Sequence, residues 1–397
     1  MDTRLHHGLE LNKTQSHRAR ERFASSLRAY VLNNMAADLR ADFDSEALPD
    51  AVKRGDAEPQ DGPDVHKLMK GRDAFNLYSS VRCAAQEMVW NSVIDSVNDN
   101  QAQLAGAFEA LSQKERLGSL TLNSDLDTPR YVSAVDVHLM PGNYDGRENA
   151  DSVIPGAVYD NGFNVFAFGA MGKQLNDIGW SMANFLRYRF ANVSPQRILD
   201  VGCTIGHNTL PWKQTFPEAE VHGVDIAAAC LRYAHTRAES LGIEAHFHQQ
   251  TAESLKFQDG SFDVVFSSMF LHELPLKSIR AFLAEAYRVL RPGGIMLHME
   301  LPPNSALTPF DAFYLDWDGY YNNEPFYKNF RDQDYRELCQ HAGFEADAFF
   351  EGVMPRFTYV DEADFAAAVG GTAEFDEDTG RLSDGIQWYG FGARKSS

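Results

Sequence analysis

The stretch Asp200-Val-Gly-Cys-Thr-Ile-Gly-His-Asn-Thr209 (DVGCTIGHNT) decides how the rest of the chain is interpreted. It follows the apolar pair Ile198-Leu199, which predicts a short buried strand that ends at the acid. Gly202 and Gly206 lie four residues apart in a turn of small residues. Glycine lets a backbone bend tightly and approach a ligand closely. The stretch therefore predicts a ligand-binding loop between a strand and a helix.

From about residue 196 onward, segments typical of strands and helices alternate along the chain. The predicted strands cover 197–201, 221–224, 245–248, 262–267 and 295–301, and the predicted helices between them include 227–241 and 277–290. Such alternation indicates an open parallel sheet with helices on both faces. Ligands of such sheets bind at the carboxyl ends of the strands. Two late extended segments, near 348–352 and 387–395, predict a hairpin at the sheet edge.

A dinucleotide is the first ligand to consider for the loop at 200–209. The dehydrogenase fingerprint is G-x-G-x-x-G after a strand, with an acid about 20 residues further on. Gly202 and Gly206 do not have that spacing, and Asp200 stands before the turn. The loop therefore argues against a nicotinamide or flavin enzyme.

S-adenosylmethionine is the second ligand to consider, and five segments in order carry a resemblance to its enzymes. These segments are Asp200–Gly206, Val221-His-Gly-Val-Asp225-Ile, Gln250–Phe257 (QTAESLKF), Phe262–Ser268 (FDVVFSS) and Ala286–Ile295 (AYRVLRPGGI). Together they resemble the motifs of class I S-adenosylmethionine-dependent methyltransferases. The resemblance covers about residues 197–300. It implies a doubly wound, mostly parallel, seven-stranded sheet of the Rossmann-like methyltransferase fold.

The resemblance also implies which residues bind S-adenosylmethionine and its product S-adenosylhomocysteine. Asp200 is expected near the amino end of the methionine part, Asp225 at the ribose hydroxyls and Ile226 beside the adenine. The helix expected to start near 206–208 would direct its N–H groups toward the carboxylate. The implied cofactor-binding residues are Asp200, Gly202, Cys203, Thr204, Gly206, Asn208, Asp225, Ile226, Thr251, Ala252, Glu253, Ser267 and Ser268.

Thr204 departs from the family pattern, because it stands where the motif normally has its second glycine. Two interpretations stay open. Its hydroxyl bonds the methionine carboxylate or a loop amide, or its side chain is a steric burden on the site.

The chemistry of methyl transfer sets what else the chain must supply. Transfer is an in-line displacement, so positioning dominates, and a base is needed only when the acceptor carries a proton. His272, in Met269-Phe-Leu-His-Glu-Leu274, is the best candidate base, and Glu273 could orient it or contact substrate. The alternative is that His272 only packs or caps the following helix.

Aromatic residues predict the substrate wall. An insert near 304–330 contains FDAFYLDWDGYYNNEPFYKNF, which suits a cationic amine or a flat ring. Asp316, Trp317, Tyr320 and Tyr321 are its candidates. The alternative is a helix packed on the N-terminal region. Tyr159 and Phe163 could close over the methionine end, or they could be core aromatics.

The rest of the chain sets the broader expectations. It has 397 residues with a formal charge of −20, which disfavours nucleic acid and membrane surfaces and favours a small-molecule substrate. Residues 1–150 predict a mainly helical region for dimerisation or for covering the site, interrupted by an exposed linker over 44–65, and residues 151–397 predict the methyltransferase domain. Four scattered cysteines and an N-terminus without an apolar run predict a cytoplasmic protein, and no cluster predicts a metal.

The function expected from the sequence is methyl transfer to an oxygen, nitrogen or carbon atom of a small molecule, in keeping with secondary metabolism. A non-methylating enzyme on the same fold and a protein or peptide methyltransferase are the alternatives.

Overall fold

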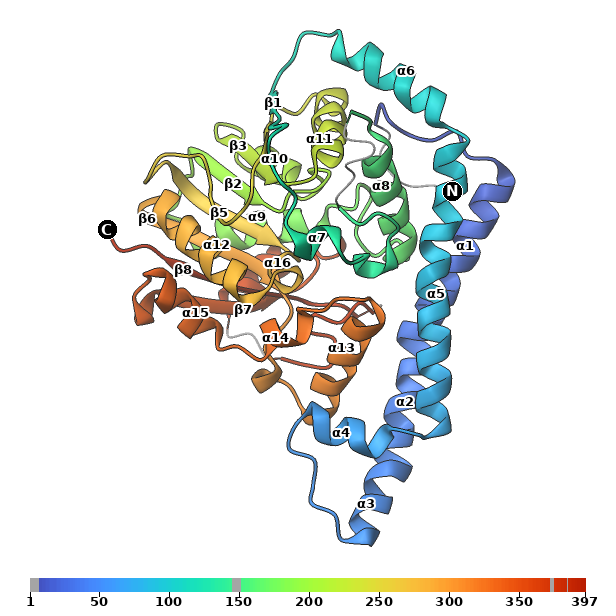
Figure 1. Cartoon of the computed structure of the whole chain (residues 1–397). Coiled ribbons are helices and arrows are strands. Elements are labelled where there is room, and N and C mark those ends of the chain that lie inside the picture. Colours follow the sequence, from blue (N-terminus) through green and yellow to red (C-terminus); the bar gives the residue numbers. More distant parts are fainter. Residues whose placement is uncertain (1–6, 145–150, 372–374, 384) are drawn as a thin grey trace.

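The computed structural model describes residues 7–144, 151–371, 375–383 and 385–397 (Figure 1). Within them, an eight-stranded sheet has the order β1-β4-β3-β2-β5-β6-β8-β7. Strands β1 to β6 run parallel, and β8 pairs antiparallel with both β6 and β7. The strands are β1 (Ser119–Thr121), β2 (Arg197–Val201), β3 (Glu220–Asp225), β4 (His246–Gln249), β5 (Phe262–Ser268), β6 (Leu290–Glu300), β7 (Phe349–Met354) and β8 (Trp388–Arg394).

The predicted doubly wound, mostly parallel sheet and its antiparallel edge hairpin are confirmed, but the predicted count of seven strands is wrong. The eighth strand is β1, which comes from the region expected to be helical. It extends the sheet because Ser119 pairs with His246 and Thr121 with His248, so β4 is not the last strand. Three residues form it, and they overlap the stretch 120–123, whose sequence pattern predicts an extended segment but not that it joins the sheet.

Helices cover both faces of the sheet. On one face lie α12 (Leu276–Val289) and α15 (Tyr335–Ala342), and on the other lie α9 (Asp177–Arg189), α10 (Leu210–Thr215) and α16 (Glu362–Gly370). Successive residues of β5 alternate between the two cores: Val265 packs with the first set, and Val264 and Phe266 pack with the second. This double burial explains why β5 has three consecutive apolar residues at 264–266. Helix α11 (Ala228–Leu241) shares a further apolar cluster with α10.

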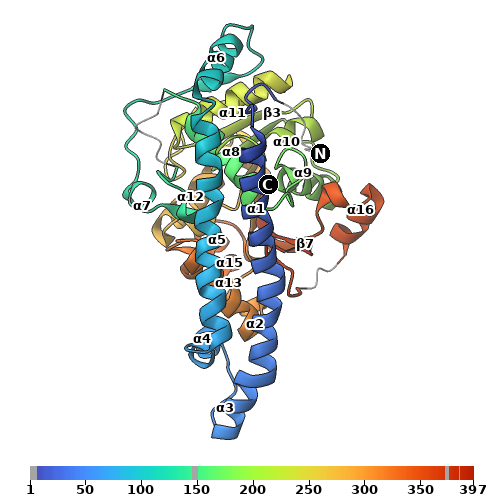
Figure 2. The same ribbon diagram turned by 90° about the vertical axis from the view of Figure 1, so that its right-hand side faces the viewer.

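The N-terminal region is built around two long helical stretches that lie side by side (Figure 2). One consists of α1 (Gln15–Tyr30), α2 (Ala36–Asp42) and α3 (Leu48–Arg54), and the other is α5 (Asp73–Asn98). Helix α5 packs against α8 (Ile154–Phe166), and α4 (Gly62–Met69) packs against α13 (Pro309–Tyr321). The remaining α-helices are α6 (Gln101–Ser112), α7 (Arg130–Ser133) and α14 (Tyr327–Arg331).

The exposed linker expected over 44–65 is mostly helical, so that prediction is wrong. Two of its three prolines begin helices instead of breaking them, since Pro49 lies in the first turn of α3 and Pro63 in that of α4, while Pro59 lies between these helices. Asp61 caps α4 by accepting a hydrogen bond from the Asp64 backbone N–H at 2.9 Å. Only the stretch between α3 and α4 lacks helix.

We keep the division near residue 150 as a proposal, with the helices of the first part serving the cavity described below. The first part contributes β1 to the central sheet, so the two parts share one sheet. None of the described helices is both long enough and apolar enough to cross a bilayer.

Candidate active site

The loop after β2 is shaped by its two glycines. Gly202 has φ +82°, and a Cβ there would lie 2.5 Å from the ring of Phe270. Gly206 has φ +70°, and a Cβ there would lie 2.9 Å from the ring of Phe247. Both positions therefore require glycine for their backbone conformation and for packing against an aromatic ring, in addition to any requirement set by a ligand. Helix α10 begins at Leu210, later than the sequence indicates.

Thr204, between these glycines, has φ +48°, which is uncommon for a β-branched residue. Its backbone N–H donates a hydrogen bond to Oδ2 of Asp225 at 2.8 Å, and its hydroxyl donates to the Gly202 carbonyl at 3.4 Å. The loop is thus tied to the end of β3 through a main-chain contact. The hydroxyl forms a loop contact, as one of the two open interpretations expects.

Asp225 ends β3 and joins two cavities. Its other oxygen, Oδ1, accepts a hydrogen bond from the Ala227 backbone N–H at 2.9 Å. Burial raises the pKa of this carboxyl, while the backbone donors oppose that rise. Each carboxylate oxygen has two lone pairs, so both can accept a further hydroxyl hydrogen bond. Asp225 therefore fits the ribose-binding role.

Two adjoining cavities open at the carboxyl ends of β2, β3 and β5. The larger has an empty volume of about 1540 Å³ including its mouth, and the smaller has about 350 Å³. Asp225, Ile226, Gly202 and Phe270 line both. The smaller cavity, with the apolar Ala252 and Leu274 beside polar Thr251, suits one edge of a flat ring. Predicted cofactor residues that line a cavity are Gly202, Cys203, Thr204, Asn208, Asp225, Ile226, Thr251, Ala252 and Ser268.

Four predicted cofactor residues line neither cavity, because other contacts hold them. Asp200 accepts a hydrogen bond from the Thr209 hydroxyl at 2.6 Å, and burial raises its pKa to about 7. Its other oxygen is buried without a hydrogen-bond partner in the described structure. Gly206 packs on Phe247 as described above. Ser267 contacts Nδ1 of His298 at 2.7 Å, and Glu253 accepts a hydrogen bond from the Tyr131 hydroxyl at 2.7 Å.

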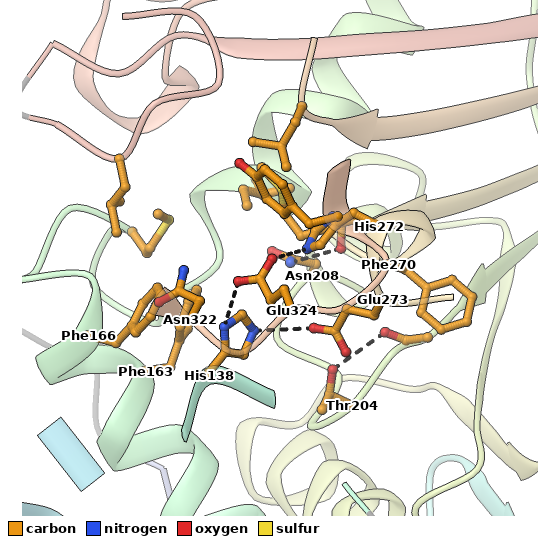
Figure 3. Close-up of a pocket in the computed structure, with 18 of the residues that line it drawn as sticks. His138, Phe163, Phe166, Thr204, Asn208, Phe270, His272, Glu273, Asn322 and Glu324 are labelled. Carbon is orange, nitrogen blue, oxygen red and sulfur yellow. Dashed lines mark hydrogen bonds and ion pairs between the residues drawn. The ribbon is translucent and has the colours of Figure 1, made fainter. Parts of the chain in front are cut away.

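His272 belongs to a network of histidines and carboxylates that borders the larger cavity (Figure 3). It lies in a short 3₁₀ turn after β5, and its Nδ1 is 2.6 Å from Glu300 at the end of β6. Glu300 is itself held by the backbone N–H groups of Phe270 and Leu271, at 2.8 and 2.5 Å. On its other side, Nε2 of His272 is 3.8 Å from Glu324. Nδ1 of His272 is thus held by Glu300, and its Nε2 points toward Glu324.

His138, in the turn at 137–139, completes the network. Its two ring nitrogens lie 3.2 Å from Glu273 and 3.2 Å from Glu324. Its carbonyl accepts hydrogen bonds from Gln86 at 2.6 Å and Trp90 at 2.7 Å. Because these partners are distant in sequence, no local pattern could have identified it.

The network sets the charge of both histidines. Burial lowers the pKa of His272, but the carboxylates, Glu300 foremost, outweigh burial and raise it to about 9. Burial likewise lowers the pKa of His138, and Glu273 and Glu324 raise it to about 10. Both rings are therefore protonated at neutral pH. His272 can accept a proton only in its minority neutral form.

Aromatic residues of α8 form one wall of the larger cavity, which places two predicted substrate residues there. Tyr159 stacks on Phe163 with ring centroids 5.6 Å apart, and Phe163 stacks on Phe166 at 6.0 Å. All three line the cavity. Figure 3 shows Phe163 and Phe166 on the side opposite Thr204 and Phe270.

The other four predicted substrate residues do not line the cavity, and that expectation is corrected. Trp317 packs on Phe75 of α5 with centroids 4.9 Å apart, and Tyr321 packs against Trp317 at 5.3 Å. Asp316 accepts a hydrogen bond from Arg331 at 2.6 Å, and Tyr320 is 67% exposed. The alternative interpretation, a helix packed on the N-terminal region, describes these residues. The cavity is lined instead by Tyr314, Leu315, Asp318, Asn322, Glu324 and Tyr327.

Comparison with known proteins follows the same residues. Residues 198–294 match the family described as a methyltransferase domain. The chain is 37% identical over 128 residues to demethylmenaquinone methyltransferase of Thermus thermophilus, covering 32% of this chain and 56% of that protein. The family match and this relative agree on the same part of the chain. The chain carries a class I S-adenosylmethionine-dependent methyltransferase domain.

Other relatives of this methyltransferase domain differ in substrate. The fatty-acid O-methyltransferase of Mycolicibacterium smegmatis is 34% identical over 126 residues, covering 32% of this chain and 44% of that protein. The chain spans about half the length of the curated relatives it matches. A solved structure of phosphoethanolamine N-methyltransferase 2 from Haemonchus contortus, bound to S-adenosylmethionine, has 20% identity and a TM-score of 0.41, covering 60% of this chain and 59% of that one. Such a distant likeness carries no conclusion about substrate.

Proposed function

We propose that this protein transfers a methyl group from S-adenosylmethionine to a small molecule held in the larger cavity. One observation carries the proposal: the Asp225 end of the site, the His272 network and the aromatic wall of α8 all border that cavity. When bound, S-adenosylmethionine supplies a methyl group already activated by a sulfonium. The chain then has to bind the methyl donor and the acceptor, orient them toward each other and exclude water from the cavity.

Each part of the cavity has a role in this proposal. Asp225 binds the ribose hydroxyls, and the smaller cavity, with Ile226 and Ala252, receives the adenine. The loop after β2, which the Thr204 backbone holds against Asp225, faces the methionine part of the cofactor. Tyr159 and Phe163 cover the acceptor side. His272, fixed at Nδ1 by Glu300, takes a proton from the acceptor with its Nε2 when it is in the neutral form.

The test of cofactor binding is calorimetric titration with S-adenosylhomocysteine. Asp225→Asn keeps the shape of the side chain but removes its charge, and hydrogen bonds to charged groups contribute about 1.5–3 kcal/mol. We expect affinity to fall about tenfold or more. Asp259→Asn, at an exposed acid outside both cavities, is the matched control. Equal affinity in Asp225→Asn and the wild type would contradict the assignment.

The acceptor class is tested with methyl-labelled S-adenosylmethionine and a cell extract split by size. We expect label in the low-mass fraction, since the lining residues come from the N-terminal helices, α8, α13 and the C-terminal loop and surround the space. Label confined to the protein fraction would favour the protein methyltransferase alternative.

We also propose that the chain forms a homodimer through its N-terminal helices. Five of its exposed large apolar residues lie there: Phe23, Tyr30, Val52, Leu77 and Met88. Sedimentation velocity should give twice the mass of one chain, and Phe23→Glu with Leu77→Glu should reduce it to a single chain. A single-chain mass for the wild type at micromolar concentration would refute the dimer.

A further inference from the structure

Three arginines and one carboxylate meet at the α8 side of the larger cavity. Arg28 comes from α1, Arg82 from α5, Asp318 from α13 and Arg381 from the loop before β8. Arg28 lies against Phe166, with its guanidinium carbon 3.8 Å from the ring centroid. Figure 3 shows Phe166 on the side of the cavity away from Thr204. This group, which we call the arginine end, is therefore remote from the cofactor loop.

Only one of these arginines has a carboxylate partner. Arg82 pairs with Asp318 at 2.5 Å and donates to Asn322 at 2.6 Å. Arg28 donates to two neutral acceptors, the carbonyl of Phe166 at 2.6 Å and the side-chain oxygen of Gln86. It is 1% exposed and lines the cavity.

Arg381 is held in the same way, by neutral groups. Its Nη2 donates to the carbonyl of Leu32 at 3.0 Å, and its guanidinium carbon lies 4.5 Å from the ring centroid of Tyr314. Its Nε is buried without a hydrogen-bond partner in the described structure. Within the described ranges, neither Arg28 nor Arg381 has a carboxylate within ion-pair distance. Within ion-pair distance the arginine end thus carries more positive than negative charge, and Glu377 and Asp378 act on Arg381 only from further away.

Such an excess is unusual in a chain with a formal charge of −20. A buried, uncompensated charge costs several kcal/mol, so a binding site is the natural reason to keep one. Guanidinium groups bind carboxylate, sulfonate and phosphate strongly, through charge-assisted hydrogen bonds. The opposite side of the cavity holds Asp225, Glu273 and Glu324, and the last two are paired with protonated His138. An anion entering the cavity therefore finds guanidinium groups without a carboxylate partner at the arginine end, whereas the histidines at the cofactor end are already paired with carboxylates.

We propose that the methyl acceptor is an organic anion with an apolar body, whose negative group binds between Arg28 and Arg381. The body lies along Phe163 and Phe166, and the reacting atom points toward the cofactor end and His272. The charge asymmetry of the cavity therefore fixes which end of the acceptor meets the methyl group. This inference rests on the proposed function, and it can be tested apart from it.

The test uses two fluorescent probes with the same rings. 1-Anilinonaphthalene-8-sulfonate carries a sulfonate, and N-phenyl-1-naphthylamine does not. Both are titrated into the full chain saturated with S-adenosylhomocysteine, so that only the acceptor side is free. We expect the sulfonate probe to bind about tenfold tighter or more, as charge-assisted hydrogen bonds require. Arg28→Met and Arg381→Met should each lower the affinity for the sulfonate probe by about that factor. The affinity for the uncharged probe should stay within twofold of the wild-type value.

The controls separate this proposal from others. Arg336→Met removes an exposed arginine on α15 that lines neither of the two cavities described above, and it should change neither affinity. Unchanged binding of the uncharged probe shows that a variant is folded. If Arg28→Met unfolds, the sulfonate affinity of Arg381→Met, at a half-buried position, tests the proposal instead. Equal affinities of the two probes, or equal losses in Arg336→Met, would overturn the inference. Failure to bind S-adenosylhomocysteine would contradict the proposed function instead, and the probes are then compared in the free protein.

Discussion

Thr204 shows what one substitution in a family motif does to a backbone. A residue whose motif position normally holds glycine keeps a left-handed conformation, at φ +48°. A non-glycine residue in a sparsely populated backbone region costs on the order of 1–3 kcal/mol. The contact from its N–H to Asp225 holds the conformation in place. The site therefore keeps its geometry at a cost in stability.

Thr204→Gly should consequently stabilise the protein. The relief of strain outweighs the extra chain entropy of glycine, which is about 0.4–1 kcal/mol, so we expect a gain of about 1 kcal/mol in the free energy of unfolding. Urea denaturation measures it. Gly206→Ala is the counterpart: it should destabilise, since φ is +70° and the new Cβ meets Phe247 at 2.9 Å. A loss of stability in Thr204→Gly would mean that the hydroxyl contacts matter more than the strain.

At the scale of elements, α13 both lines the cavity and packs against the N-terminal helices. Tyr314, Leu315 and Asp318 face the cavity, while Trp317 packs on α5 and donates to Ser79 at 3.0 Å. The close approach of α4 on the other side depends on Gly62, where a Cβ would lie 3.0 Å from the backbone of Phe313. Helix α13 therefore lies between the cavity and the N-terminal helices and contacts both.

This division predicts opposite outcomes for two neighbouring aromatics of α13. Trp317→Ala removes a half-buried ring from the contact with α5, and we expect a loss of about 2 kcal/mol in stability with unchanged affinity for S-adenosylhomocysteine. Tyr320→Ala, at a side chain that is 67% exposed, should change stability by less than about 0.5 kcal/mol. Thermal denaturation compares them. Similar losses in both variants would show that Tyr320 also packs, in an interface between chains.

At the scale of the whole molecule, the network of His138 and His272 joins four distant segments: the turn at 137–139, the turn after β5, the end of β6 and the segment after α13. Protonated His138 binds Glu273 and Glu324 together, and its pKa is raised to about 10 from an ordinary value near 6.5. Between these values the folded state holds a proton that the unfolded state has lost. Its contribution is therefore complete below about pH 6.5 and disappears as the pH rises toward 10.

Unfolding by urea at pH 6.5 and pH 9 tests this linkage. The wild type should lose on the order of 1–3 kcal/mol more than His138→Gln over that interval, because glutamine has no proton to release. Lys256→Gln, at an exposed position, should follow the wild type. Parallel losses in the wild type and His138→Gln would show that His138 is neutral in the folded protein.

The sequence predicted the parts of this molecule that rest on local pattern. The strands that end near Asp200 and Asp225, the edge hairpin and most cofactor residues on the cavity follow from short motifs with fixed spacing. It could not predict what depends on packing between distant segments. The side of α13 that faces the cavity is set by α4 and α5, His138 is positioned by Gln86 and Trp90, and Arg28 meets Phe166 only in the folded chain.

Strand β1 has a consequence for how the chain avoids association. An open sheet edge offers unpaired N–H and C=O groups to any other extended chain. On that side β4 is covered by Ser119–Thr121, a strand too short to recruit a partner itself. The three residues of β1, which belong to the N-terminal part, thus protect the β4 side of the sheet against edge-to-edge aggregation.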